Sequence, residues 1–231
     1  MIDELERPPT LAAAAADALR DAILRGDLRP GQPLREGELS ASLNVSRGTV
    51  REAQRLLQDE GLVEVVPHRG AFVAELSPRT VREMYTLRAL LEAYAVRLAM
   101  EKDAYSEEDF ETMETLLRRM GEFEEKGDIF AYIEADLEFH HEICKWSDHG
   151  LLLDVLKSVQ SLSRLCMINV KLYRTDLEPD GVQHRHIYDA IRTGDPEQAE
   201  DAVREHLGFS RIALVAKVEE VQDEHGDSEN R

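Results

Sequence analysis

Residues 35–73 read REGELSASLNVSRGTVREAQRLLQDEGLVEVVPHRGAFV, and this stretch decides how the N-terminal part of the chain folds. A short polar helix is expected to end at Asn44, because asparagine tolerates the left-handed backbone conformation that closes many helices. Ser46 then stands where a helix N-cap belongs. Apolar residues recur behind it at three- and four-residue spacing: Val50, Ala53, Leu56 and Leu57. Such spacing is one face of a helix, so the stretch predicts two helices joined by a tight turn.

The residues that follow predict a two-stranded wing. Gly61 provides the C-terminal stop of the second helix. Residues 62–66 alternate as a strand does, residues 67–70 (PHRG) have turn chemistry, and residues 71–74 predict a second short strand.

The start of the second helix has the chemistry of a phosphate-binding element. A helix N-terminus offers free N–H groups and the positive end of a dipole, which suit phosphate. The hydroxyl and guanidinium side chains at this end can reach phosphate oxygens and guanine edges in a major groove. They belong to Ser46, Arg47, Thr49 and Arg51. A small packed helical unit with solvated arginines would show the same residues, and the residues alone leave both interpretations open.

The same stretch resembles the winged helix-turn-helix of the GntR family of bacterial transcription regulators. The family pattern is V-S-R-x-x-V-R-E-A, then E-G-L-V, then R-G-x-x-V, and residues 45–53, 60–63 and 69–73 meet it. The resemblance implies a protein that binds double-stranded operator DNA, and we expect it to bind as a homodimer. We therefore expect DNA contacts from Arg35, Ser46, Arg47, Thr49, Arg51, His68, Arg69 and Gly70.

Composition and charge limit the class of protein. The chain has 231 residues, 42% hydrophobic and 32% charged, which is enough for two domains with their own cores. No apolar run reaches the length of a membrane span, and acidic residues precede the alanine run at 12–16 where a signal peptide needs positive charge. Cys144 and Cys166 form no metal or disulfide pattern. We expect a cytoplasmic protein without a membrane partner.

The net charge of −19 is unusual for a DNA-binding protein, because lysine and arginine drive binding to the DNA backbone. Residues 77–231 carry most of it, with 19 basic and 34 acidic residues. Residues 29–74 hold six arginines and six acids and are neutral. Binding must therefore depend on where a few arginines stand, and we expect modest non-specific affinity.

The remainder of the chain predicts helices. Ser77 and Pro78 are a helix start, as N-cap and first helical residue. Turn and capping residues then separate helices expected at 78–102, 107–125, 129–145, 152–174, 182–193 and 196–221, after an N-terminal helix at 11–25. We predict a mainly α protein with a winged helix-turn-helix domain (8–76), an all-α antiparallel helical bundle for effector binding and dimerisation (77–221), and a disordered polar tail (222–231).

The second part resembles the FCD effector-binding domain of the FadR subgroup of that family. Its landmarks are R-x-x-x-E, D-x-x-x-H, H-x-x-I and a late histidine. They fall at Arg88 and Glu92, at Asp136 and His140, at His184, and at His206.

Asp136 and His140 lie four residues apart on one helical face, so both side chains can reach one ion. The spacing alone selects no ligand set from the eight histidines, and partly buried polar residues bonded to each other or to water are the other interpretation. The resemblance selects Asp136, His140, His184 and His206, which suit a divalent transition metal: zinc, with nickel, manganese or cobalt as alternatives. It also implies a small carboxylate effector that completes the metal's coordination.

Two further residues are expected in the effector pocket. Arg88 lies in an apolar helical stretch and needs a partner, which is either the effector carboxylate or Glu92. Asn169, a lone amide in an apolar run, either lines the pocket or satisfies a neighbouring helix.

Together these observations predict a transcription regulator, a repressor, whose operator affinity depends on a small organic acid bound at a metal. One alternative is a sensor for which the metal itself is the signal. Another is a metal-dependent hydrolase or isomerase, since such a site can activate water. No nucleophile motif or phosphate loop supports catalysis, so we predict no enzyme.

Overall fold

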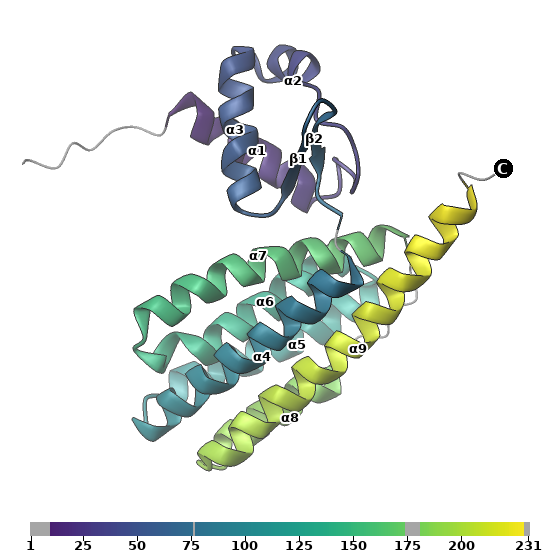
Figure 1. Ribbon diagram of the computed structural model, residues 1–231. Coiled ribbons are helices and arrows are strands. Elements are labelled where there is room, and N and C mark those ends of the chain that lie inside the picture. The colour runs from purple at the N-terminus through teal and green to yellow at the C-terminus, as the bar shows by residue number, and fades with distance from the viewer. Residues whose placement is uncertain (1–9, 76, 174–180, 229–231) are drawn as a thin grey trace, which may run out of the picture. The chain divides into compact units, whose positions relative to one another are not determined.

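The computed structural model describes residues 10–75, 77–173 and 181–228 (Figure 1). The chain forms two compact units, of which the first ends at Glu75 and the second begins at Leu76. The first is a winged helix-turn-helix and the second is a helical bundle, so the predicted fold class is confirmed.

The first unit contains three helices and a hairpin: α1 (Leu11–Leu24), α2 (Glu36–Leu43), α3 (Arg47–Asp59), β1 (Val63–Val66) and β2 (Gly70–Val73). Asn44 closes α2 with a φ of 53°, in the left-handed region that the sequence predicted. Ser46 caps α3 by accepting a hydrogen bond from the Thr49 backbone N–H. The tight turn between α2 and α3 thus follows from one helix stop and one helix start.

The wing is an antiparallel hairpin in which Val63 pairs with Val73 and Val66 with Gly70. An isolated bridge between Pro33 and Phe72 joins the connecting segment before α2 to the outer side of β2. His68 and Gly70 have positive φ angles of 64° and 104°, which turn the chain tightly at the wing tip.

The core of this unit is formed by α1, α3 and the wing. Ile23, Val50, Leu57, Leu62 and Val73 are all at most 1% exposed. They bury the apolar face of α3 and leave its arginine-bearing face to solvent, so the packing determines which side of α3 can meet a partner.

The second unit consists of six α-helices and one short 3₁₀ helix among the described residues: α4 (Pro78–Glu101), α5 (Glu107–Lys126), α6 (Ile129–Cys144), the 3₁₀ helix Lys145–Ser147, α7 (Gly150–Tyr173), α8 (Gly181–Arg192) and α9 (Pro196–Ser228). Ser77 caps α4 with Pro78 in its first turn, as predicted. Ser106 and Asp109 form a capping box at the start of α5, and Gly127 ends that helix with a φ of 66°.

Helix α4 is central to the bundle, where it packs against α6, α7 and α9 (Figure 1). The side chains between these helices are apolar and fully buried, including Val96, Phe139, Ile143, Leu165 and Val203. Several charged or ionisable side chains are buried among them, which is uncommon unless they are paired or bind a ligand. They include Arg88, Glu92, Asp136, His140, His184 and His206.

The last helix extends further than the sequence predicted. The sequence suggested that the last helix ends near Val221, but α9 continues to Ser228. Each residue added to an existing helix gains a backbone hydrogen bond without a new nucleation cost, so a polar sequence can extend it. Residues 229–231 lie outside the described part of the chain.

None of the helices in the described ranges is both long and apolar enough to cross a membrane.

Candidate functional site

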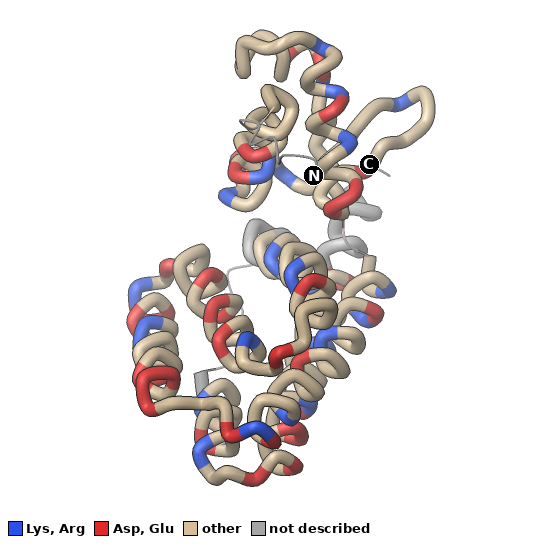
Figure 2. The backbone as a smooth tube through the Cα atoms, turned by 90° about the vertical axis from the view of Figure 1, so that its left-hand side faces the viewer, with Lys and Arg blue, Asp and Glu red and all other residues tan. Residues whose placement is uncertain are grey.

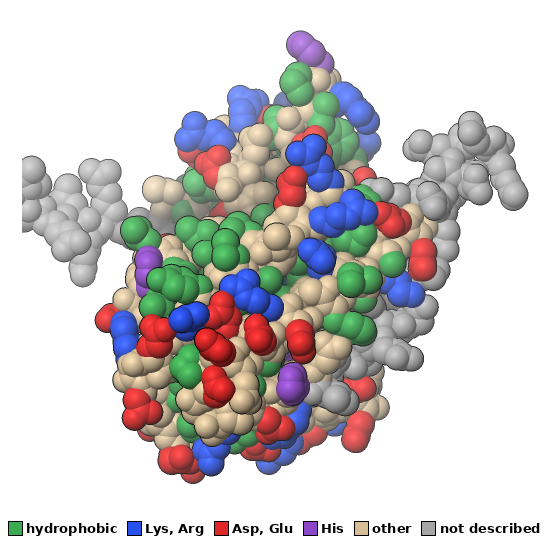
Figure 3. Space-filling model, turned by 60° about the horizontal axis from the view of Figure 1, so that its bottom comes forward, with side chains coloured by type: hydrophobic (Ala, Val, Ile, Leu, Met, Phe, Trp, Pro, Cys, Tyr) green, Lys and Arg blue, Asp and Glu red, His purple; other side chains and the backbone are tan. Residues whose placement is uncertain are grey.

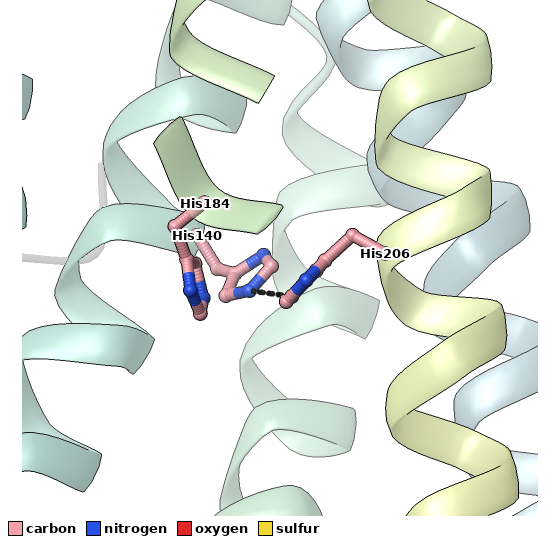
Figure 4. A group of neighbouring side chains, drawn as sticks. All are labelled: His140, His184 and His206. Atoms are coloured by element: carbon pink, nitrogen blue, oxygen red, sulfur yellow. Dashed lines mark hydrogen bonds between the residues drawn. The ribbon is translucent and has the colours of Figure 1, made fainter. Parts of the chain in front are cut away.

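Three imidazole rings meet inside the second unit. His140 comes from α6, His184 from α8 and His206 from α9, and all three are buried (Figure 4). Each offers a ring nitrogen, and these atoms lie within 4.8 Å of one another. The Nε2 atoms of His140 and His206 are 3.1 Å apart. Three helices distant in sequence therefore direct nitrogen donors at one small volume.

Asp136 adjoins this cluster from the preceding turn of α6. Its Oδ1 lies 2.9 Å from Nε2 of His184, and the side chain is buried. Burial alone would raise the pKa of this carboxyl, but the hydrogen bond with His184 and the charge of Arg88 bring it below its usual value. The structure thus brings together Asp136, His140, His184 and His206, with an ionised carboxylate beside the imidazoles.

His206 is held as a neutral ring. Burial is the largest cause that moves its pKa well below the ordinary value, and the neighbouring His184 and His140 act in the same direction. A neutral imidazole is the form that binds a metal.

The neighbouring histidines lie outside the cluster. His141 and His186 are exposed although each is within two residues of a cluster member. The helical period separates them, as the sequence analysis expected.

A buried ion pair lies directly behind His140. Arg88 Nε donates to Oε1 of Glu92 at 2.7 Å, and Oε2 of Glu92 lies 2.6 Å from Nδ1 of His140. Burial would raise the pKa of Glu92, but the charge of Arg88 and the hydrogen bond with His140 lower it. The sequence indicated Glu92 only as a partner for Arg88; its contact with His140 joins residues 48 apart in the chain.

Arg88 has unused hydrogen-bonding capacity. Its side chain is 1% exposed and its guanidinium lies over the ring of Tyr85, 5.1 Å from the ring centre. The Nη2 atom has no hydrogen-bond partner among the described residues. A buried guanidinium with an open donor is a natural partner for a carboxylate. The side chain of Asn169, the other expected pocket residue, lies outside the described part.

The exposed start of α3 carries the predicted DNA-contacting residues of the first unit. The Ser46 hydroxyl accepts from the Thr49 N–H at 3.1 Å and shares a hydrogen bond with the Thr49 hydroxyl at 2.9 Å. Arg47 and Arg51 are exposed on the same helix. Figure 2 shows basic positions interspersed with acidic ones along the backbone of the first unit.

Two of the predicted DNA-contacting arginines are paired with acids of α2. Arg51 donates through Nε and Nη2 to Glu36 at 2.9 and 2.7 Å, and Arg35 donates to Glu38 at 3.0 Å. Exposed ion pairs such as these contribute little to stability, so phosphate or a base can replace the acid. The pair between Arg51 and Glu36 could not be predicted from local spacing, because the two residues are 15 apart in the chain.

The wing tip presents the remaining predicted contacts. His68, Arg69 and Gly70 are exposed, and the Arg69 guanidinium lies over the ring of Phe72 at 5.4 Å. The ring positions the guanidinium by a cation–π contact, and Arg69 remains exposed at the wing tip.

Comparison with known proteins decides the family. Residues 11–73 match the bacterial regulatory proteins of the gntR family, and residues 83–209 match the FCD domain. The transcriptional regulator LutR of Bacillus subtilis is 30% identical over 219 residues, which cover 86% of this chain and 98% of LutR. The chain belongs to the GntR family. Its relatives are transcription regulators and not enzymes, so the prediction that it is no enzyme is confirmed.

Two other GntR-type proteins support this assignment. The Glc operon transcriptional activator of Escherichia coli is 28% identical over 226 residues, which cover 87% of each chain. A crystal structure of a GntR regulator from Rhodococcus sp. RHA1 is 26% identical, covers 89% of this chain and 97% of its own, and has a TM-score of 0.76.

The buried residues of the FCD unit of this GntR protein fit a divalent metal ion. Three imidazoles and one carboxylate are a donor set that zinc and its neighbours accept. His140 has its Nδ1 occupied by Glu92, which is the arrangement found around histidines that bind metals through Nε2.

Proposed function

We propose that this GntR regulator is a dimeric repressor whose operator affinity is set by a small organic acid bound at a metal. Asp136, His140, His184 and His206 hold the metal, and Arg88 pairs with the carboxylate of the acid. When bound, the metal supplies a Lewis-acidic binding point for a carboxylate oxygen.

The observation that carries the acid-binding proposal is the open Nη2 of Arg88. Leaving a buried charged donor without a hydrogen bond costs free energy, and a bound anion removes that cost. The pairing with Glu92 uses Nε and leaves this donor available. A small carboxylate is the chemical group that would satisfy both a guanidinium donor and a metal.

DNA reading is supported by the capped, exposed start of α3 and by the wing. Arg35, Arg47 and Arg51 contact bases or adjacent phosphates, with Ser46 and Thr49 in support. His68, Arg69 and Gly70 place the wing on the minor groove or backbone. Because the first unit has no broad basic field, two half-sites bound by a dimer give the necessary affinity.

The dimer contact that we favour is a groove between α4 and α9. Its lining includes three leucines and two arginines: Leu87, Leu90, Leu207, Arg82 and Arg211. Leu90 is 54% exposed, and large exposed apolar side chains mark interaction surfaces when they gather. Figure 3 shows hydrophobic side chains between charged ones on one face of the molecule.

Release of the operator by the acid requires that acid binding and operator binding be thermodynamically coupled. An acid shifts the protein only if it binds one arrangement of the dimer more tightly than the other. Two recognition helices must match two half-sites one helical turn apart, so an acid-favoured arrangement with another spacing loses affinity. The acid then releases the operator.

The test uses His184→Ala with His186→Ala as the matched control on the same helix. We expect purified wild-type protein and the control to contain one divalent metal per chain by elemental analysis. The His184 variant should lose the metal and still bind operator DNA. Unchanged metal content in that variant would refute the ligand set.

The same material tests the alternative of a metal sensor. Operator binding is measured across a buffered zinc series without any organic acid. A change in operator affinity with zinc alone would favour the sensor, whereas a flat response together with an acid identified by mass spectrometry supports the proposal.

A further inference from the structure

Glu92 makes a separate contact with each of its two carboxylate oxygens. Oε1 accepts from Arg88 Nε at 2.7 Å, and Oε2 faces Nδ1 of His140 at 2.6 Å. Arg88, Glu92 and His140 are each at most 1% exposed. Water therefore has little access to this chain of contacts, and the protein groups alone determine where its hydrogens lie.

The chain of contacts determines the tautomer of His140. A carboxylate only accepts hydrogen bonds, so at 2.6 Å Nδ1 of His140 carries the hydrogen and donates it. A neutral ring then has its lone pair on Nε2, the atom that points at His206. The other tautomer would set two lone-pair-bearing atoms against each other on the Glu92 side.

Arg88 keeps Glu92 in this orientation. Both residues stand on α4, four residues apart, so one helical face presents them together. The guanidinium holds Oε1 and thereby directs Oε2 at α6. Without this anchor, the second oxygen would have no fixed direction.

We propose that Glu92 is a positioning residue for the metal centre: held by Arg88, it fixes the His140 tautomer that leaves Nε2 available to the metal. This inference rests on the proposed function, because it assigns a role beside the same site. Glu92 also connects the proposed metal site with the proposed acid-binding site. One of its carboxylate oxygens contacts the metal ligand His140, and the other contacts Arg88.

Glu92→Gln is the decisive variant because it preserves size and shape. The amide oxygen can still accept from Arg88 Nε, which places the amide NH₂ against Nδ1 of His140. His140 must then accept at Nδ1 and carry its hydrogen on Nε2, where it blocks the metal. In the opposite orientation the amide NH₂ faces Arg88 Nε–H, so two hydrogen-bond donors oppose each other.

Loss of such an outer partner lowers metal affinity by roughly 10- to 100-fold. We expect that loss for Glu92→Gln when zinc is titrated against a chelating dye. The matched control is Glu200→Gln, which removes an ion-paired carboxylate from α9 at Arg97 and Arg204. It should bind zinc as wild type does. Equal zinc affinity of the Glu92 variant and wild type would overturn the proposal.

A spectroscopic measurement separates positioning from a general loss of structure. Long-range ¹H–¹⁵N correlation spectra of histidine-labelled protein distinguish hydrogen on Nδ1 from hydrogen on Nε2, and His140→Gln identifies the signals. Wild type without zinc should show His140 with hydrogen on Nδ1, because zinc bound at Nε2 would impose that tautomer even without Glu92. Hydrogen on Nε2 in wild type would overturn the proposal even if the Glu92 variant fails to fold. Failure of wild type to bind zinc would instead remove the proposed function.

Discussion

Replacing Arg51 by alanine tests how a DNA-binding unit without a net positive charge recognises an operator. In the free protein this side chain is 70% exposed and is held by Glu36 through two hydrogen bonds. An exposed pair is easily exchanged, so the acid does not prevent Arg51 from meeting DNA. The ion pair instead keeps the guanidinium extended from the start of α3.

The expected loss follows from the contact that Arg51 makes. A bidentate contact with guanine typically contributes a factor of roughly 5 to 150 in affinity, and a dimer on two half-sites would lose the square of that factor. Fluorescence anisotropy with an operator duplex and a scrambled duplex measures it. If Arg51 contacts a base, its loss should lower affinity for the operator duplex and not for the scrambled duplex. The salt dependence of operator binding should change little.

A phosphate contact would behave differently. It would weaken both duplexes equally and reduce the slope of log K against log salt by roughly 0.9 for each arginine lost. Arg119→Ala on α5, which removes an exposed arginine paired with Glu138, is the control and should leave both affinities unchanged. If Arg51→Ala binds both duplexes within twofold of wild type, the assignment of α3 as the reading helix is wrong.

Other consequences can be measured on the same protein. The depressed pKa of His206 means that, below its ordinary value of about 6.5, the unfolded chain binds a proton that the folded chain does not. Metal-free protein should therefore lose up to about 1.4 kcal/mol of stability per pH unit from pH 6.5 down to pH 5, measured by urea unfolding, and His206→Gln should lose less. Ser46→Ala removes the α3 cap and should destabilise the first unit by about 1 kcal/mol in thermal unfolding, whereas Ser46→Asp should retain most of the stability. Leu90→Asp should convert the dimer to a monomer in light-scattering chromatography; an intact dimer would exclude the α4–α9 groove as the contact.

Local signals in the sequence were sufficient to predict most of the helices and their ends. Asn44, Ser46, Ser77, Ser106 and Gly127 act within one helical turn of their own position, so their roles as stops and caps can be predicted without tertiary structure. The end of α9 could not be predicted in this way, because a polar helix and a polar tail have similar composition.

The candidate site needed the tertiary structure. Asp136 and His140 share a helical turn and could be paired from spacing, but His184 and His206 come from other helices, and only the family resemblance selected them. The contact between Glu92 and His140 spans 48 residues and follows no local rule. The same is true of the pair between Glu36 and Arg51, which depends on how α2 crosses α3.

The balance of six arginines and six acids across residues 29–74 has a consequence for the regulator inside a cell. Bulk chromosomal DNA retains proteins mainly through their positive charge, and this unit offers little of it. Few copies of the regulator should therefore be sequestered at random sites, and most of them should stay in a freely diffusing pool. Operator occupancy would then follow copy number directly, without a large chromosomal reservoir to buffer it.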